Sequence, residues 1–367
     1  MSARVEILSG VGGKHPAAIL VETAGVRLLL DAGASLCAER PESWWCGLEV
    51  DAVVISHDHV DHIGAVARLD PQIPLYATAQ TARSLPPGRD WRALPLRGAV
   101  DILGVEVRCG QAGHALGGVW LHLGIGGGIL YSGDFSLESA LLPFDVPPPA
   151  TVALLDASYG AYHCALDQAQ ARIAAAMTGP TLFPVPPSGR ALEMALWLQR
   201  RWPGEWSMDD TCQAALEAAL ADPQAGELIR PSALAALGRL LERHQGFDPG
   251  ARLLLAADPD GLGGTVARLL ADPRRRHRAI FTGHLDPQGP PGMRTQDLRL
   301  RWNVHPRLED LRWLLERIEA ARCVPLFTAI EDEYAWRAAL GVSLVLPAQV
   351  PGERAATQAP ARLSLAV

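Results

Sequence analysis

The sequence predicts an α/β fold that carries a metal centre, and three observations lead to this prediction. Short β-branched runs alternate with glycine-rich turns in the N-terminal part of the chain, and alanine- and leucine-rich segments of helical length follow them. Polar side chains stand just past the ends of several of the short runs. One of these polar groups is a dense run of histidine and aspartate. Polar residues past strand ends mark the rim of a sheet, where active sites tend to collect.

The expected strands of the N-terminal part each lead to a polar residue that can carry chemistry. The runs are Val26–Leu30 before Asp31, Val53–Ile55 before His57, Ile129–Tyr131 before Asp134, and Thr151–Leu155 before Asp156. Because β-branched and aliphatic residues bounded by glycine favour short strands, we expect these four polar residues at one edge of the sheet structure.

The rest of the chain alternates helical segments with short apolar runs. Helices are expected over Leu166–Met177, Ala191–Arg201, Cys212–Ala221, Ser232–His244 and Leu308–Ala321, and strands over Thr181–Val185, Arg252–Ala256, Cys323–Phe327 and Val342–Leu346. The alternation up to Ala256 predicts a second α/β unit. The last fifteen residues, rich in Ala, Pro and Arg, are expected to form a mobile tail.

Length and composition indicate a globular protein of two domains. A chain of 367 residues that is 49% apolar exceeds the usual domain size of about 100 to 200 residues. No apolar run approaches the roughly 20 residues of a membrane span, and the N-terminus lacks the features of a signal peptide, so we expect a cytoplasmic protein with no membrane partner. The six cysteines form no C-x-x-C pair, which favours a reducing compartment. They are Cys37, Cys46, Cys109, Cys164, Cys212 and Cys323.

The net charge of −7 argues against attraction of nucleic acid over the whole surface. Arginines nevertheless outnumber acidic residues between Ala267 and Arg322, and we expect Arg274, Arg275, Arg276 and Arg278 to form a solvated basic face. Lys14 is the only lysine. We interpret this scarcity of lysine as a coding bias.

The segment from Ser56 to His62, with the sequence S-H-D-H-V-D-H, predicts a metal-binding turn. It places three imidazoles and two carboxylates in six consecutive positions after a strand, and these are ligands that Zn²⁺ prefers. Two more candidate ligands follow: His114 in a glycine-flanked loop, and Asp134 after the strand Ile129–Tyr131. Glycine beside a ligand lets the backbone approach an ion closely.

These motifs resemble the metallo-β-lactamase superfamily: H-x-H-x-D-H is followed by G-H and then by S-G-D, and the earlier L-L-L-D-A-G is similar to the superfamily's first motif. The resemblance implies an αββα sandwich and two zinc ions, the second bound weakly or replaced by manganese. It assigns His57, His59 and His114 to one ion, Asp61 and His62 to the other, and Asp134 as a bridge between them. Asp31 would orient the ligand turn from behind.

The rest of the chain is similar to the β-CASP nucleases, a branch that includes RNase J, the mRNA 3′-end cleavage endonucleases and the DNA cross-link repair nucleases. Asp156, in D-A-S-Y-G, resembles the acidic motif A of the branch, and G-R-A-L-E from Gly189 to Glu193 resembles its later helix start. His305 in N-V-H-P-R matches motif B. In the branch, this histidine pairs with the motif A carboxylate and protonates the leaving oxygen.

One element of the branch is missing. RNA-cleaving members carry a further histidine, motif C, that completes the second ion's shell, whereas this chain has L-F-T-A-I-E from Leu326 to Glu331 and His305 is its last histidine. The DNA repair members also lack motif C. Its loss puts full occupancy of the second metal site in question.

Together these inferences predict an αββα metallo-β-lactamase sandwich from residues 1–162 and 294–367, with a small α/β, β-CASP-like cap from residues 163–293. The expected function is hydrolysis of a phosphodiester in RNA or DNA to give a 5′-phosphate, with Asp61 and Asp134 positioning the attacking hydroxide and Asp156 and His305 handling the leaving group. Two alternatives stay open: a hydrolase of a small ester, thioester or phosphodiester, and a non-catalytic scaffold relative. A homodimer is a further option that the sequence does not decide.

Overall fold

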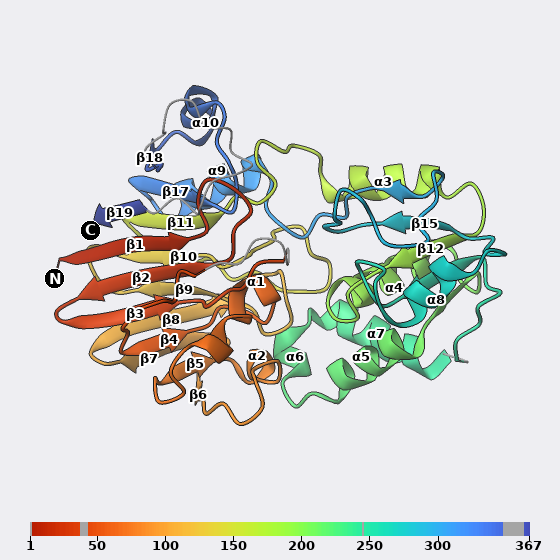
Figure 1. Cartoon of the computed structure of the whole chain (residues 1–367), viewed down its shortest axis with the longest axis horizontal. Coiled ribbons are helices and arrows are strands. Elements are labelled where there is room, and N and C mark those ends of the chain that lie inside the picture. The colour runs from red at the N-terminus through yellow and green to blue at the C-terminus, as the bar shows by residue number, and fades with distance from the viewer. Residues whose placement is uncertain (1, 37–42, 244–245, 348–362) are drawn as a thin grey trace. The chain divides into compact units, whose positions relative to one another are not determined.

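The computed structural model describes residues 2–36, 43–243, 246–347 and 363–367. It divides into two compact units (Figure 1). Unit 1 comprises Met1–Leu137, Phe144–His163 and His305–Val367, and unit 2 comprises Glu138–Pro143 and Cys164–Val304. The domain boundaries expected from the sequence stay a prediction. Cys37 and His244, which the sequence analysis names, lie outside the described residues.

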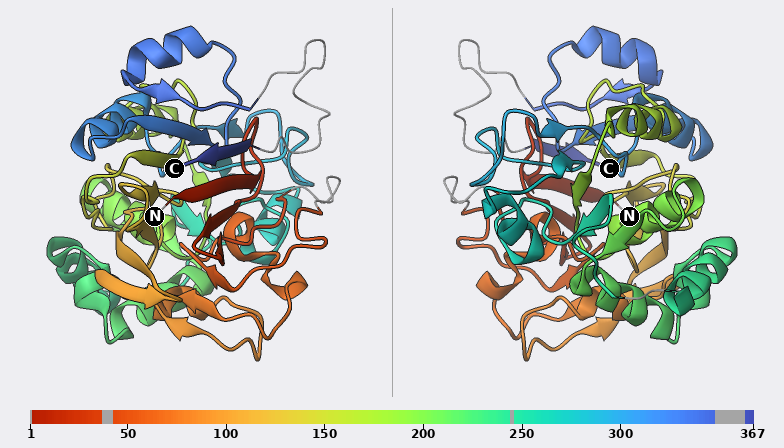
Figure 2. Two further views of the ribbon diagram at one scale, coloured as in Figure 1. Left: turned by 90° about the vertical axis from the view of Figure 1, so that its left-hand side faces the viewer. Right: turned by 90° about the vertical axis from the view of Figure 1, so that its right-hand side faces the viewer.

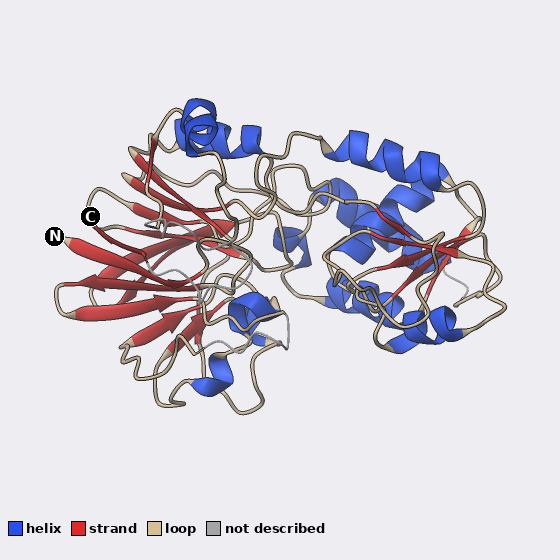
Figure 3. Cartoon of the chain, turned by 45° about the horizontal axis from the view of Figure 1, so that its top comes forward, coloured by secondary structure: helices blue, strands red, loops and turns tan. Residues whose placement is uncertain are grey.

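Unit 1 contains two seven-stranded sheets. The first sheet has the order β19 (Leu363–Ala366), β1 (Ala3–Ser9), β2 (Ala18–Thr23), β3 (Val26–Leu30), β4 (Ala52–Val54), β5 (Leu75–Ala77) and β6 (Arg92–Ala93). The second has the order β18 (Ser343–Leu344), β17 (Arg322–Leu326), β11 (Val152–Asp156), β10 (Ile129–Tyr131), β9 (Val119–Leu123), β8 (Val105–Gln111) and β7 (Gly98–Ile102). The strands of unit 1 lie in these two sheets, with helices outside them (Figure 3).

Both faces of the central strands are buried, which places them inside a layered structure. Leu28, Leu29 and Leu30 of β3 have no exposed surface although they alternate between the two faces of the sheet. On its outer side the first sheet packs its apolar residues against Ile63 of α1 (Val60–Ile63) and Val66 of the 3₁₀ helix η1 (Val66–Arg68). The short helix α2 (Ala79–Ala82) follows β5.

The second sheet is covered by α9 (Leu308–Arg317) and α10 (Glu333–Leu340). Leu308, Leu311, Leu314 and Leu315 lie three or four positions apart, so they form one apolar face of α9, and they pack with buried residues of β10 and β11. Helices outside two stacked sheets give the αββα arrangement that the sequence predicts.

The last described residues correct one expectation. Residues 353–362 of the expected mobile tail lie outside the described residues, but β19 pairs antiparallel with β1, with Arg4 opposite Ala366. Two backbone hydrogen bonds of 2.8 Å join Ala3 and Val367, and both ends of the described chain therefore belong to one sheet (Figure 2).

Unit 2 is built on a parallel five-stranded sheet. Its strands, in spatial order, are β13 (Trp206–Met208), β14 (Leu253–Ala256), β12 (Thr181–Pro184), β15 (Arg278–Phe281) and β16 (Leu298–Arg299). Its helices are α3 (Leu166–Ala176), α4 (Arg190–Arg201), α5 (Asp210–Ala221), α6 (Ala225–Leu228), α7 (Pro231–Arg243) and α8 (Gly264–Ala271). No helix in the described parts of either unit is long and apolar enough to cross a membrane.

Two charged side chains of unit 2 have structural partners. Glu193 of α4 accepts hydrogen bonds from Ser139 Oγ at 2.6 Å and from Trp302 Nε1 at 3.0 Å. Arg275, expected on a solvated face, is buried and pairs through two nitrogens with Asp297 at 3.2 and 2.8 Å. A run of arginines does not reveal from sequence which member turns inward, because the partner lies 22 positions away.

Candidate metal centre

The predicted ligands of unit 1 come together where strands of its two sheets end. Strand β4 leads into the ligand turn, β10 leads to Asp134, and β11 ends at Asp156. Because β10 and β11 are parallel and paired in register, Asp134 and Asp156 emerge at the same edge of the second sheet. The loop that carries His114 reaches this edge through Gly113, which has φ +71° and whose Cβ would come within 2.2 Å of Ser136 O.

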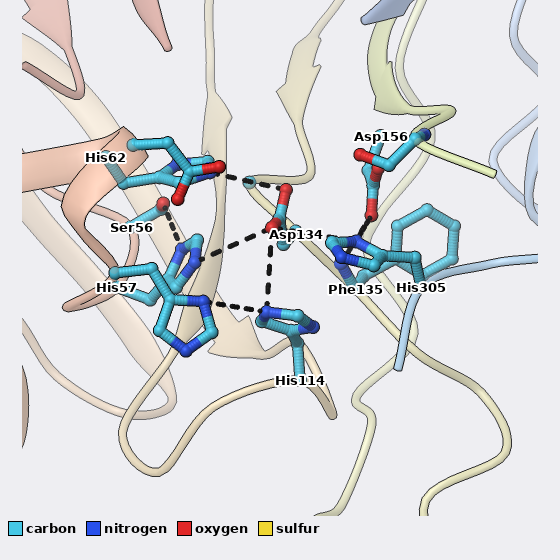
Figure 4. A network of polar contacts seen from close by, with 12 residues as sticks. Ser56, His57, His62, His114, Asp134, Phe135, Asp156 and His305 are labelled. Carbon is cyan, nitrogen blue, oxygen red and sulfur yellow. Dashed lines mark hydrogen bonds and ion pairs between the residues drawn. The ribbon is translucent and has the colours of Figure 1, made fainter. Parts of the chain in front are cut away.

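Four side chains form what we call the first cluster: His57, His59, His114 and Asp134. His114 Nε2 lies 3.1 Å from His59 Nδ1 and 3.5 Å from Asp134 Oδ2, and His57 Nε2 lies 3.8 Å from the same oxygen (Figure 4). A zinc ion with bonds of about 2.0–2.1 Å to tetrahedral ligands needs ligand separations of roughly 3.3 Å. The spacing of the first cluster therefore fits a metal ion.

A second cluster consists of Asp61, His62 and Asp134, so that Asp134 belongs to both clusters. His62 Nε2 lies 3.3 Å from Asp134 Oδ1. His57 Nε2, His62 Nε2 and Asp134 Oδ1 are buried atoms without a hydrogen-bond partner. Buried polar atoms are normally satisfied, so three of them converging on one place support a cation between them.

Asp31 fixes the orientation of the ligand turn from behind. Its carboxylate accepts hydrogen bonds from Ser56 N at 2.7 Å and from Ser56 Oγ, His62 Nδ1 and Tyr131 Oη at 2.6 Å each. Since Ser56 gives its only hydroxyl proton to Asp31, it accepts the bond from His57 Nδ1 at 3.0 Å. One carboxylate thereby directs Nε2 of His57 and Nε2 of His62 toward the clusters.

Asp156 and His305 form a pair next to the first cluster, as the resemblance predicts. His305 Nδ1 lies 2.8 Å from Asp156 Oδ2 and 3.6 Å from Asp134 Oδ2. Asp156 is fully buried, and its Oδ1 accepts a hydrogen bond from Ser158 N at 2.9 Å. The Asp156 carboxylate that binds His305 is therefore held in a fixed position (Figure 4).

The electrostatic environment of the centre shifts the pKa values of two of its histidines in opposite directions. Burial, together with the charges of His62 and His59, holds the pKa of His57 well below its usual value, so His57 stays neutral as a ligand must be. Burial alone would lower the pKa of His62, but Asp134 and Asp31 raise it well above its usual value. Burial opposes ionisation of Asp134, yet the charges of His62, His305 and Lys14 hold its pKa well below the usual range.

Lys14 also lies at the centre, and the sequence analysis did not identify it. Its Nζ is 3.3 Å from Asp61 Oδ2. Burial would lower the pKa of Lys14, but the carboxylates of Asp134, Asp61 and Asp156 raise it above its usual value. The only sequence signal was that Lys14 is the single lysine of an arginine-rich chain, placed in a glycine-rich turn.

The position expected for motif C is occupied by Phe327, at the end of β17. Its ring lies against the imidazole of His62, with ring centroids 5.4 Å apart in a T-shaped arrangement. Phe327 has φ +63°, a left-handed conformation that is uncommon for a bulky residue. A phenyl ring offers no ligand atom, so the loss of a ligand inferred from the sequence agrees with the geometry.

The comparisons with known proteins agree with this centre. A family model described as the beta-lactamase superfamily domain matches residues 26–185, which contain the ligand turn, His114, Asp134 and Asp156. This match and the two sheets of unit 1 confirm the predicted resemblance to the metallo-β-lactamase superfamily and the predicted sandwich fold. The β-CASP-like cap stays a prediction.

Two archaeal relatives named transcription termination factor FttA match about half of the chain. The protein from Cenarchaeum symbiosum is 28% identical over 243 residues, covering 52% of this chain and 38% of the relative. The protein from Methanocaldococcus jannaschii is 27% identical over 252 residues, covering 53% and 39%. The alignment thus spans about two fifths of each relative.

A crystal structure of a protein of unknown function from Enterococcus faecalis V583 has a TM-score of 0.60 over all of both chains at 16% identity, which shows a shared fold alone.

Proposed function

We propose that this chain is a metal-dependent phosphodiester hydrolase that cleaves nucleic acid, with zinc bound by the first cluster. The observation that carries the proposal is the convergence of unpartnered ligand atoms on Asp134, next to a histidine–carboxylate pair. Zinc held there would supply Lewis acidity and lower the pKa of a water molecule to about 7.

The residues around the cluster have separable tasks in this proposal. Asp134 orients the attacking water, because its carboxylate faces both clusters. His305 holds a proton for the leaving oxygen: its Nδ1 is bound to Asp156, which leaves Nε2 as the donating atom. Asp156 holds the imidazole ring in place through Nδ1, so we assign it as a positioning residue.

A nucleic-acid substrate is supported by two points. The motifs from Asp156 to His305 resemble those of a nuclease branch, and the two archaeal relatives carry the name of a transcription termination factor. The proposal includes both RNA and DNA as substrates, because the DNA-cleaving members of the branch also lack motif C. A cytoplasmic location stays a prediction that the five free cysteines among the described residues support, and a homodimer stays a prediction as well.

The test is incubation of the purified chain with end-labelled single- and double-stranded RNA and DNA, with added Zn²⁺ or Mn²⁺. We expect hydrolysis of at least one polymer, products with a 5′-phosphate, and loss of activity with chelator. Hydrolysis of an aryl phosphodiester without cleavage of any polymer would favour the small-substrate alternative. A zinc-loaded chain that cleaves nothing would favour the scaffold alternative.

A further inference from the structure

Lys14 is held in a defined position at the second cluster. Its Nζ lies 3.3 Å from Asp61 Oδ2 and donates a hydrogen bond to Ser158 Oγ at 3.2 Å. The same ammonium lies over the ring of Phe327, 5.3 Å from its centroid. The side chain is 32% exposed, so most of its surface is removed from water. A carboxylate, a hydroxyl and a ring face thus fix the cation on three sides.

Phe327 and the loop of Lys14 are joined through the backbone. Phe327 N donates a hydrogen bond of 2.6 Å to Gly10 O, and a Cβ on Gly10 would lie 3.1 Å from the Phe327 ring. Gly10 and Lys14 belong to the same turn between β1 and β2. The residue that stands in the motif C position therefore also supports the turn that delivers the ammonium.

We propose that the Lys14 ammonium takes the place of the second metal ion, so that the centre binds one ion at the first cluster and uses Lys14 as its second cation. This inference rests on the proposed function, since it assumes an ion at the first cluster. It replaces the expectation of a weakly bound second ion.

Charge and ligand count both favour one ion plus lysine over two ions. The second cluster offers Asp61, His62 and the shared Asp134, and Phe327 adds no fourth ligand. An ion bound to Asp61 would lie within a few ångströms of the ammonium, where like charges repel strongly in a buried site. Lysine suits this role better than arginine, because its ammonium is a compact point charge and the guanidinium is a broad planar group.

The place of Lys14 at the second cluster also gives it a role toward the substrate. An ammonium has three donors, and Asp61 and Ser158 take two of them. In this proposal the third donor binds a phosphoryl oxygen of the substrate, whose negative charge the ammonium offsets without a second ion. Lys14 is thus a substrate-binding cation in this proposal.

Metal stoichiometry tests the inference without depending on activity. The full chain and its variants are saturated with Zn²⁺, passed over a desalting column, and measured by elemental mass spectrometry, and zinc-edge anomalous diffraction locates each ion. We expect one zinc per wild-type chain, at the first cluster. Phe327→His should still bind one, because Lys14 occupies the second position. The double variant Lys14→Met with Phe327→His should bind two.

Histidine is a suitable replacement at position 327 because it tolerates the left-handed backbone better than most residues. Lys14→Arg in the Phe327→His background is the matched control that keeps a cation, and it should bind one zinc. Circular dichroism and thermal unfolding check that each variant is folded.

The outcomes separate the two proposals. Two zinc ions in the wild-type chain would overturn the role of Lys14 and leave the hydrolase proposal standing. The same holds if a folded double variant retains only one ion. A wild-type chain that retains no zinc would overturn the proposed function, and the inference about Lys14 with it.

Discussion

Replacing Asp31 with asparagine should destabilise unit 1 because four hydrogen bonds meet on this one buried carboxylate. The donors are Ser56 N, Ser56 Oγ, His62 Nδ1 and Tyr131 Oη, at 2.6 to 2.7 Å. An asparagine keeps the volume and tolerates the φ of +59°. Its NH₂ group, however, would face donors. If two charge-assisted bonds of about 1.5–3 kcal/mol each are lost, the cost is roughly 3–6 kcal/mol.

The measurement is urea unfolding of wild type and Asp31→Asn in the presence of chelator, so that metal binding does not add to the difference. Thermal unfolding under the same conditions should show a melting temperature lower by roughly 6–24 °C, at about 2–4 °C per kcal/mol. Asp51→Asn is the matched control: this exposed aspartate accepts one bond, from Arg27 N at 2.7 Å, and its loss should cost less than about 0.5 kcal/mol. A cost for Asp31→Asn below about 1 kcal/mol would refute the network argument.

Four further predictions concern single side chains. His59→Ala should remove both zinc and activity while circular dichroism shows an intact fold, because the strands pack independently of the ion. His305→Ala should lower kcat by roughly 10²- to 10⁴-fold at unchanged zinc content, and by less with an aryl phosphodiester, whose leaving group needs no proton. Arg275→Ala should cost about 3–5 kcal/mol in urea unfolding, because the buried Asp297 carboxylate loses its charged partner and keeps only backbone donors. Burial and the adjacent Asp260 raise the pKa of Asp258 from 3.8 to about 6. Because the folded state then binds the proton more tightly than the unfolded state, the stability of the fold decreases as pH rises from 4 to 6. Asp260→Asn should therefore be more stable than wild type at pH 8 but not at pH 4.

The ligand turn was predictable from sequence because its chemistry is local. Val26–Leu30 and Ile129–Tyr131 have the predicted bounds, and the strand expected over Val53–Ile55 is observed as Ala52–Val54. Each run is short and bounded by turn residues, so its end is well defined. The strand β8 was not predicted, although its alternation of Val-Glu-Val-Arg is the pattern of a half-buried strand.

Long-range pairs were beyond reasoning from local pattern. Asp156 and His305 are 149 positions apart, and only the family resemblance suggested that they meet. Lys14 and Arg275 were interpreted as unremarkable basic residues, because a sequence shows charge but not burial. Their environments depend on partners that the fold brings from distant parts of the chain.

The geometry of the second cluster shows why its two unusual residues belong together. A histidine at position 327 beside Lys14 would place a ligand next to an ammonium, which gives that ligand no ion to bind. A phenylalanine at 327 without Lys14 would leave the buried Asp61 carboxylate with neither an ion nor an ammonium beside it, and burying an unpaired charge is costly. With both present, the ring supports the ammonium at 5.3 Å and the ammonium neutralises the carboxylate at 3.3 Å. The ammonium thus pairs the carboxylate that the loss of a ligand at position 327 would leave without an ion, and the ring supports the ammonium. In our proposal, a cation that belongs to the chain takes the place of an ion from solution.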